Sequence, residues 1–348
     1  MKRLLVSAFP INGGVGTYSD LLFKLGFFND FAFFKIRKND DENGYSMVVK
    51  YNFNPHGLMN YLSTFFESKY SRIVKKYDFV HVTSTDFFHL SKYNKNMVGT
   101  VHDIFPIDDK ISKSAYSIFY RHYFKKELEY MKNLKGIVVN SNHIKQKLLS
   151  LYPDIDLTVI HIWTGDNFKI RDKMEARKKL GLPLDKTILL NVSSDQPRKN
   201  ISILPKVMNN LNDHYYLVRI GPSDKIIKNF KSKNYKIIEK VSSENYPYYF
   251  NASDILLDPS KNEGFGRPII EAINSNLPVI ASDIDVFREI LGIQYKYFAD
   301  PDNPENWIDL IENFSSNKYV YPEKIKNYYR KERAQIQYFE FYKKIDVL

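Results

Sequence analysis

Two glutamates flank a short glycine-containing run late in the sequence. Glu263 precedes Gly264-Phe265-Gly266, and Glu271 stands four residues after Arg267, with Pro268 between them. The glycines let bare backbone approach a ligand, and proline is tolerated in a first helical turn, so the run predicts a tight turn followed by a helix. We expect Glu271 in the first turn of that helix and both carboxylates at one pocket. The alternative is that Glu271 only balances the helix dipole.

Two adjacent cations stand in an earlier loop that also precedes a helical pattern. Arg198 and Lys199 follow Ser193 and Ser194, which come directly after an apolar run, and the helical pattern begins near Ile201. Cations combined with the free N–H groups of a helix start form a site for phosphate groups. The alternative is a pair of solvated loop side chains.

Two weaker signals lie in the first third of the chain. Gly13, Gly14 and Gly16 follow the apolar run 4–8 and open a helical pattern, which offers backbone N–H groups to an anion; a plain tight turn is the alternative. His102 follows the apolar run 97–101 and precedes Asp103. A histidine placed there can exchange a proton with a substrate hydroxyl, and a structural hydrogen bond is the alternative.

All of these residues follow short apolar runs that predict buried strands. The runs are 4–8, 79–82, 97–101, 136–139 and 157–160 and, after Gly165, 187–192, 216–220, 235–238, 254–257 and 277–281. Helical patterns alternate with them, which predicts parallel sheets with helices on both faces. Because ligands of such sheets bind outside the carboxyl ends of the strands, the residues that follow each strand are the candidate site.

The rhythm occurs twice, so the 348 residues predict two domains rather than one large sheet. We expect an α/β chain with a Rossmann-like domain at 1–165, a second at 166–321 and a closing helix at 322–348. The pattern at 322–346 is charged and aromatic. It predicts one long helix that is too polar for a core and straps across the molecule.

The run from Glu263 to Glu271 resembles the glutamate-x7-glutamate signature of the retaining glycosyltransferases of family four. Further matches follow in family order: Gly13-Gly14-Val15-Gly16, His102-Asp103, Asn140-Ser141, Arg198-Lys199-Asn200 and Ala281-Ser282-Asp283. The resemblance implies the GT-B fold, in which two Rossmann-like domains face each other across a cleft and a closing helix crosses back to the first domain. The first domain would take the acceptor and the second the donor.

The resemblance also implies an activity. A retaining, metal-independent enzyme would move a hexose from a UDP- or GDP-linked sugar to a hydroxyl of a glycan or lipid-linked saccharide, with no cofactor and no metal. The implied catalytic residues are His102, Glu263, Lys199 and Arg198. The implied donor-binding residues are Gly13, Gly14, Gly16, Ser193, Gly264, Phe265, Gly266, Arg267 and Glu271.

The resemblance also implies a role for each of these residues, and the roles agree with what a sugar transfer needs. Lys199, with Arg198, would neutralise the departing diphosphate, and the glycines at 13–16 would approach it from the other domain. Glu271 would hold ribose hydroxyls, Glu263 would hold sugar hydroxyls together with the backbone of 264–267, and His102 would contact the sugar near the reacting carbon.

Two positions depart from the family pattern. Ser193 and Ser194 stand where many relatives place Gly-Arg, so Arg198 would have to supply that charge. Arg267 occupies a position that is often apolar in the family.

The amino-acid composition argues against several other classes of protein. With no cysteine there is no disulfide or thiolate metal site, which fits a reducing cytoplasm. No apolar stretch reaches 18 residues, and the run that starts at Leu4 ends at Pro10, too short for an export segment. The net charge of +11 suits nucleic acid, anionic lipid or phosphorylated partners, or else serves solubility alone. A basic nucleic-acid-binding protein is therefore a further alternative function, but no recognition motif supports it.

Two alternatives stay open. One is a metal-dependent glycosyltransferase that uses an Asp-x-Asp pair: Asp154/Asp156, Asp283/Asp285 or Asp300/Asp302. The other concerns residues 110–135, where seven Lys or Arg residues interleave with aromatics. This segment predicts either a basic helix that contacts anionic lipid at the inner membrane face, or a helix whose Phe119, Tyr123 and Leu128 pack on the sheet.

Overall fold

The computed structural model describes residues 1–11, 13–34, 44–49, 67–108, 115–314 and 320–348. Contacts divide the chain into two compact units. Unit 1 contains residues 1–162 and 334–348, and unit 2 contains residues 163–333.

Unit 1 is built on a seven-stranded sheet in which every strand pair is parallel. The strand order is β3-β2-β1-β4-β5-β6-β7. The strands are β1 (Arg3–Ser7), β2 (Asp30–Phe34), β3 (Met47–Val49), β4 (Phe79–Val82), β5 (Met97–Val101), β6 (Gly136–Val139) and β7 (Thr158–Val159). Nearly every residue of β1, β4 and β5 is buried, as continuous apolar runs in a sheet covered on both faces require.

The helices of unit 1 connect these strands. They are α1 (Gly14–Phe23), α3 (Glu67–Val74), the 3₁₀ helix η1 (Thr85–Lys92), α4 (Phe105–Asp108), α5 (Ala115–Glu129), η2 (Tyr130–Asn133) and α6 (Asn142–Leu151). The last helix of the chain, α15 (Lys331–Lys344), belongs to unit 1 from residue 334 onward. Side chains cap the starts of η1 and α6. At α6, for example, the Ser141 hydroxyl accepts a hydrogen bond from the Ile144 N–H (3.1 Å).

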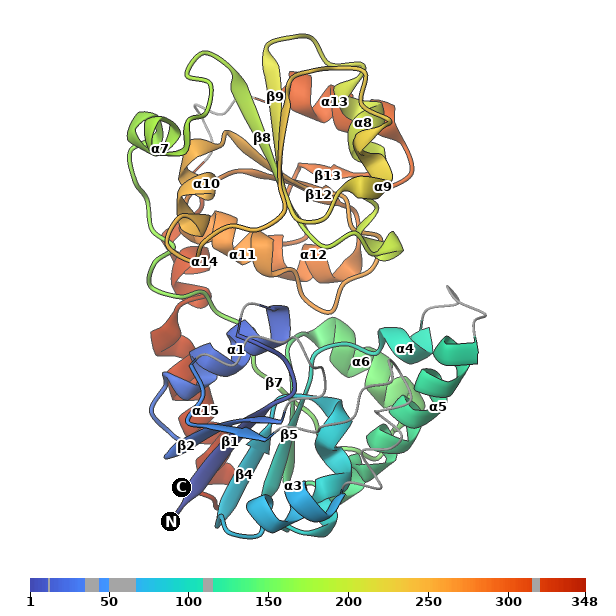
Figure 1. Ribbon diagram of the computed structural model, residues 1–348, viewed down its shortest axis with the longest axis vertical. Coiled ribbons are helices and arrows are strands. Elements are labelled where there is room, and N and C mark those ends of the chain that lie inside the picture. Colours follow the sequence, from blue (N-terminus) through green and yellow to red (C-terminus); the bar gives the residue numbers. More distant parts are fainter. Residues whose placement is uncertain (12, 35–43, 50–66, 109–114, 315–319) are drawn as a thin grey trace. The chain divides into compact units, whose positions relative to one another are not determined.

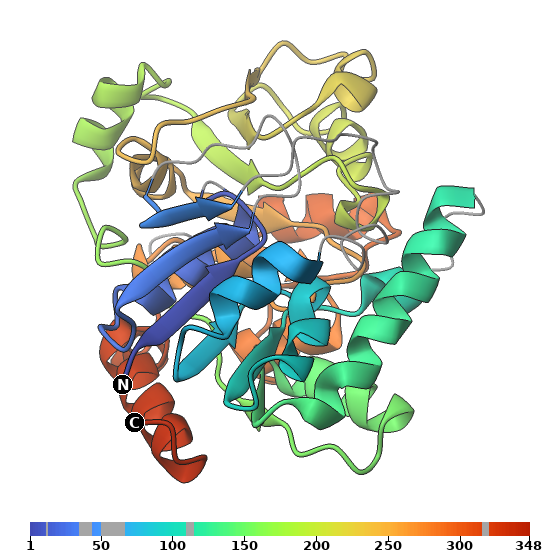
Figure 2. The ribbon, with the colours of Figure 1, turned by 60° about the horizontal axis from the view of Figure 1, so that its bottom comes forward.

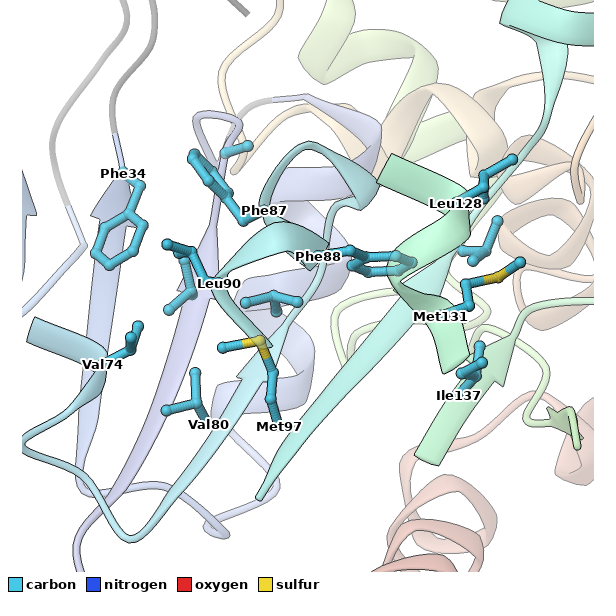
Figure 3. Packing of buried hydrophobic residues seen from close by; sticks show 14 of the residues in the cluster. Phe34, Val74, Val80, Phe87, Phe88, Leu90, Met97, Leu128, Met131 and Ile137 are labelled. Atoms are coloured by element: carbon cyan, nitrogen blue, oxygen red, sulfur yellow. The ribbon is translucent and has the colours of Figure 1, made fainter. Parts of the chain in front are cut away.

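The core of unit 1 joins the sheet to η1, α5 and η2. Phe88 and Leu90 of η1 belong to the same buried cluster as Val80 and Met97 of the sheet (Figure 3). Leu128 and Met131 complete the same cluster next to Ile137 on β6. The segment that follows β4, which is η1, is therefore anchored by apolar packing against the middle of the sheet.

Unit 2 contains a six-stranded sheet, again parallel throughout, in the order β10-β9-β8-β11-β12-β13. The strands are β8 (Thr187–Val192), β9 (Tyr215–Ile220), β10 (Tyr235–Ile238), β11 (Ile255–Asp258), β12 (Val279–Ser282) and β13 (Phe298–Ala299). The helices are α7 (Lys173–Leu180), η3 (Pro197–Lys199), α8 (Ile203–Met208), α9 (Asp224–Ile227), α10 (Tyr246–Ala252), α11 (Arg267–Asn274), α12 (Asp285–Leu291), α13 (Pro304–Glu312) and α14 (Glu323–Tyr328).

The predicted fold class, two Rossmann-like parallel sheets, is confirmed. Each predicted strand is present within two residues of its expected ends, whereas β2, β3 and β13 were not predicted. In both sheets the first strand of the unit is central and the order reverses beside it, as in nucleotide-binding α/β folds.

The prediction of one long, polar closing helix at 322–346 is wrong in two respects. The segment forms two helices, α14 and α15, which are separated at Tyr329 and Arg330. In addition, α15 is not too polar to be buried, since Ala334, Tyr338, Phe341 and Tyr342 lie in the interior of unit 1. The marks for the two chain termini lie side by side in both views of this unit (Figures 1 and 2).

Hydroxyl groups join the two buried tyrosines of α15 to the rest of unit 1. The Tyr342 hydroxyl hydrogen-bonds His81 Nδ1 on β4 (2.6 Å), and the Tyr338 hydroxyl bonds the hydroxyl of Tyr18 on α1. Thr100 on β5 bonds both His81 Nε2 (2.8 Å) and the Tyr18 hydroxyl (3.1 Å). Burial lowers the pKa of His81 to about 3, so this buried network is uncharged at neutral pH.

Candidate active site

The main candidate site lies in unit 2, in the loops that follow the neighbouring strands β8 and β11. Both loops leave the carboxyl ends of parallel strands, where such sheets bind ligands. The loop after β8 contains Ser193 and η3, and the loop after β11 runs from Pro259 to Gly266 into α11.

Glu263 is the centre of this site. Its Oε2 accepts a hydrogen bond from Arg198 Nη1 (3.0 Å), and its Oε1 accepts one from Lys199 Nζ. The three side chains are largely buried, with exposed fractions of 8% for Glu263, 15% for Arg198 and 14% for Lys199. Burial alone would raise the pKa of Glu263, but Lys199 and Arg198 outweigh burial and lower it. Glu263 is therefore an anion held between two cations.

Backbone contacts hold the two loops together. The Lys261 N–H donates to the Arg198 carbonyl (2.7 Å), and Arg198 Nη1 donates to the Asn262 carbonyl (3.2 Å). Asn200 ends η3 in the left-handed conformation with φ 51°, and its side chain donates to the Pro301 carbonyl (2.6 Å). These contacts fix the direction in which the cations leave the loop.

Glu271 corrects one prediction. It is the fifth residue of α11 and lies in the second turn, so it does not receive the free N–H groups of a helix start. Side chains hold it instead: the Tyr246 hydroxyl donates to Oε2 (2.8 Å) and Arg267 Nη2 donates to Oε1 (3.0 Å). Burial raises the pKa of Glu271, and the two donors offset this effect only in part.

The glycine run between the two glutamates has one position that only glycine fills well. Gly266 has φ 130°, and a Cβ there would lie 2.8 Å from the Phe287 ring. Phe265 is buried, and its ring meets that of Tyr329 edge-on at 6.1 Å. Phe265 thus anchors the turn, while Gly264 precedes it in the loop.

Two buried residues of this site were not singled out from the sequence. Asp258 ends β11, and its Oδ1 accepts hydrogen bonds from the Ser260 hydroxyl (2.6 Å) and N–H (3.3 Å). Burial raises its pKa to about 6, and Glu263 contributes in the same direction. Arg219 lies on β9 next to the Ser193 loop. The only sequence signal for either was a charged residue near the carboxyl end of an apolar run.

The remaining predicted residues belong to unit 1. Gly13 caps α1, and Gly16 packs so closely on Pro10 that a Cβ would lie 1.8 Å from the Pro10 carbonyl oxygen. Around Gly14 a Cβ would have open space. His102 follows β5, its carbonyl accepts from Asn140 Nδ2 (2.9 Å), and its ring meets the Tyr18 ring edge-on at 4.6 Å. These residues lie at the carboxyl ends of β1 and β5.

The Asp-x-Asp pairs are engaged with cations. Asp283 accepts from Arg288 Nη2 (2.6 Å), Asp302 pairs with Lys261, and Asp156 pairs with Lys344 (3.3 Å). Across the described ranges, no three His, Asp or Glu side chains gather in a way that could hold a metal ion.

The basic segment 110–135 coincides largely with α5. Residues 109–114 lie outside the described residues, and so does the side chain of Phe119. Tyr123, Phe124 and Leu128 are buried in unit 1, while Lys125 and Lys126 are exposed and Ile118 is 59% exposed. Among the helices that the structure describes, none has the length and apolar character to cross a bilayer.

Comparison with known proteins extends over both units. The family description "Glycosyltransferase Family 4" matches residues 30–163, and "Glycosyl transferases group 1" matches residues 172–332. The chain belongs to glycosyltransferase family 4. This membership agrees with the resemblance of the Glu263–Glu271 run.

A curated relative of this family 4 chain is the O-antigen chain mannosyltransferase RfbU of Salmonella typhimurium. The two are 29% identical over 230 residues, which is 63% of this chain and 61% of the relative. The chain spans about half to three-fifths of the length of the first curated relatives that it matches.

Solved structures with the same GT-B fold cover the whole family 4 chain. HepE of Anabaena, crystallised with UDP and glucose, matches with a TM-score of 0.80 and 14% identity over 99% of this chain and 100% of that one. Sucrose-phosphate synthase of Thermosynechococcus elongatus matches with a TM-score of 0.79 and 16% identity over 99% of both chains. At these identities the likeness concerns the fold.

Proposed function

We propose that this chain transfers a hexose from a UDP- or GDP-linked sugar to a hydroxyl of a glycan or lipid-linked saccharide, without a metal ion and with retention of the anomeric configuration. The observation that carries the proposal is the buried cluster of Glu263, Lys199 and Arg198 at the carboxyl ends of β8 and β11. The O-antigen mannosyltransferase relative and the HepE complex with UDP support this class of acceptor and donor.

The cluster has the charges that a departing diphosphate needs. Lys199 and Arg198 are fixed by backbone contacts before any ligand arrives, so little reorganisation is required when negative charge develops on the leaving oxygen. Without a ligand, Glu263 pairs with both cations and offsets one of their two positive charges. With the donor bound, the diphosphate takes over the cations, and Glu263 becomes free to accept hydrogen bonds from sugar hydroxyls.

The same charges argue for metal independence. A nucleoside diphosphate needs a cationic partner as it leaves, and a metal ion held by carboxylates is one solution. Here two side-chain cations occupy the predicted diphosphate site, and each Asp-x-Asp pair has a carboxylate engaged with Lys or Arg. The Asp-x-Asp mechanism is the alternative function that the experiment below separates.

Retention follows from the roles of the carboxylates. An inverting enzyme needs a base aimed at the incoming hydroxyl. Glu271 is held by Tyr246 and Arg267, and in the donor complex Glu263 is committed to hydroxyls of the sugar, so neither carboxylate is left to act as that base. We infer that the attacking hydroxyl enters on the face from which the diphosphate leaves.

The test is turnover of UDP-glucose, UDP-galactose and GDP-mannose by the full chain with a saccharide acceptor library, first in excess EDTA and then with added MnCl₂. We expect one donor to stabilise the fold in thermal unfolding and to be consumed in EDTA. NMR of the anomeric proton should show the donor's configuration in the product. Turnover that requires manganese would favour the Asp-x-Asp alternative, and an inverted product would contradict retention.

A matched pair of lysine variants tests the site itself. Lys199→Ala should lower kcat/KM by about 10²–10³, the usual effect of removing one positioned donor to a developing anion. Lys261→Ala is the control, because Lys261 lies in the neighbouring loop but is exposed and pairs with the exposed Asp302. Equal activity of the two variants would contradict the assignment of Lys199.

A lipid-linked acceptor would bring the enzyme to a membrane surface, and α5 is the segment proposed to meet it. Because Tyr123, Phe124 and Leu128 are buried, the contact would be electrostatic and made by exposed residues such as Lys125 and Lys126. Lys125→Glu/Lys126→Glu should then abolish sedimentation with phosphatidylglycerol vesicles at low salt. Unchanged sedimentation would remove α5 from the proposal.

A further inference from the structure

Arg219 is a fully buried arginine in unit 2, with none of its surface exposed. It lies on β9 one residue before the strand ends, on the same face as the core residue Leu217. A cation at this depth is unusual, because a charge loses several kcal/mol of hydration when it is buried and normally regains it from a carboxylate partner.

The guanidinium is held by backbone carbonyls. Its Nη2 donates to the carbonyls of Ser194 (3.3 Å) and Pro222 (3.2 Å), and its Nη1 donates to the carbonyl of Ile220. Its Nε has no hydrogen-bond partner among the residues that the structure describes. Arg219 thus joins the loop after β8 to the loop after β9.

The charge of Arg219 is not neutralised by a salt bridge within the described part of the chain. Burial lowers its pKa to about 10, and the carboxylate of Asp195 offsets this effect only in part. At neutral pH the side chain is therefore a cation whose positive field is weakly screened by the low-dielectric interior.

A second buried arginine of unit 2, Arg177, differs from Arg219 in having a carboxylate partner. Arg177 on α7 donates to the carbonyls of Ala252 (2.9 Å), Lys186 (3.1 Å) and Leu184 (3.2 Å), much as Arg219 binds its carbonyls. Arg177 also pairs with Asp254 (2.5 Å), at the amino end of β11. The arginine at the amino end of the sheet has a carboxylate partner, whereas the arginine at the carboxyl end has none among the described residues.

Arg219 contacts the loop that carries the two cations of the candidate site. Arg219 donates a hydrogen bond to the loop at Ser193–Ser194, and this loop leads into Arg198 and Lys199. Gly221 permits the close approach, because it has φ 123° and a Cβ there would lie 2.1 Å from the Ser193 carbonyl oxygen. A buried positive charge that contacts the loop carrying two further cations favours a ligand with more than one negative charge.

We propose that Arg219 is a positioning residue for the diphosphate of the donor. It fixes the Ser193–Ser194 backbone that faces the ligand, and its uncompensated charge is neutralised when the diphosphate binds. This inference rests on the proposed function, and it predicts that Arg219 contributes to the recognition of phosphates but not of the nucleoside.

The test compares a nucleoside diphosphate with the nucleoside of the same base. Binding of UDP and uridine, and of GDP and guanosine, is measured by calorimetry and NMR titration for the wild type, Arg219→Gln, Arg219→Lys and the control Arg177→Gln. We expect Arg219→Gln to weaken binding of the preferred diphosphate about tenfold or more, and to change nucleoside binding by less than about twofold. Arg219→Lys, which keeps the charge, should lose less.

Arg177→Gln separates this role from a structural one. It also removes a buried arginine that binds three carbonyls, so it should lower the unfolding temperature without a selective loss of diphosphate affinity. Should Arg219→Gln fail to fold, Arg219→Lys carries the test, with an expected loss of about threefold for the diphosphate alone.

Two results would overturn the inference while the proposed function stands. One is wild-type diphosphate affinity in both Arg219 variants. The other is an equal loss for diphosphate and nucleoside, which would mean that Arg219 only stabilises the fold. If the wild type binds neither UDP nor GDP, the proposed function fails and this inference fails with it.

Discussion

Lys199 and Arg198 both bind the carboxylate of Glu263, so under the proposed function Glu263 competes with the diphosphate for the same two cations. The variant Glu263→Gln should therefore bind the free nucleoside diphosphate several-fold more tightly than the wild type. Its sugar transfer should nevertheless fall by about 10²-fold, because the neutral amide accepts weaker hydrogen bonds from the sugar hydroxyls in the transition state than the carboxylate does. Calorimetry with the diphosphate and turnover assays check the two effects, and a loss of diphosphate affinity would contradict the competition.

Asp86 gives a prediction about pH at the same scale. It is buried in unit 1, accepts from the Ser84 hydroxyl (2.8 Å), and has no partner for Oδ1 among the described residues. Burial raises its pKa from 3.8 to about 6; Ser84 and His89 oppose this effect, and Glu127 and Asp103 add to it. Above pH 6 the ionised carboxylate costs stability, and the cost disappears as pH falls from about 6 toward 4.

The variant Asp86→Asn removes this titration and keeps the bond to Ser84. We expect it to stabilise unit 1 by about 1–3 kcal/mol at pH 7.5, with the gain shrinking to near zero at pH 4. Urea unfolding at several pH values measures the difference. A variant that is less stable than the wild type at pH 7.5 would mean that the ionised carboxylate stabilises the fold.

At the scale of elements, the start of α1 offers a matched pair of glycines. Gly16→Ala should destabilise unit 1 by about 1–3 kcal/mol, because its Cβ would collide with the Pro10 carbonyl. Gly14→Ala should fold normally, since its Cβ meets open space. Hydrogen exchange of the α1 amides and diphosphate affinity are the measurements. A folded Gly14→Ala with weakened diphosphate binding would assign this loop to the ligand, whereas unchanged binding would leave it a structural turn.

The strands were predictable because continuous apolar runs in a parallel sheet need no long-range information. The exceptions have physical reasons. β3 and β13 are only three and two residues long, too short to stand out as apolar runs. The break between α14 and α15 contains neither glycine nor proline, so local sequence gives no warning of it.

The site was predictable only as residue types at strand ends. Their positions after predicted strands indicated that Glu263 and the Arg198-Lys199 pair lie at the same edge of a sheet. Glu263 and Lys199 are 64 positions apart in the sequence, so no local pattern reveals their ion pair. Glu271 shows the opposite case. A proline early in the helix suggested the first turn, whereas its actual partners, Tyr246 and Arg267, are set by tertiary packing. The functional roles of these residues, including His102 and the glycines at 13–16, stay predictions.

For the whole molecule, the division into units predicts how fragments behave. Unit 2 is one continuous stretch, 163–333, with its own sheet and core, so this fragment should fold and bind the nucleoside diphosphate alone. The fragment 1–162 lacks Tyr338 and Tyr342, which bond Tyr18 and His81, and should not fold cooperatively. Circular dichroism melting and calorimetry test both fragments. A cooperative melt of 1–162 would show that residues 334–348 are dispensable.

The assignment of residues 334–348 to unit 1 also has a consequence for synthesis on the ribosome. Translation delivers β1 to β7 first, yet their core stays incomplete until α15 has emerged, after all of unit 2. Unit 2 has its whole sequence available earlier and can fold while the first sheet still exposes apolar surface. While unit 2 is being synthesised, the first sheet therefore exposes apolar surface that only residues 334–348 can cover.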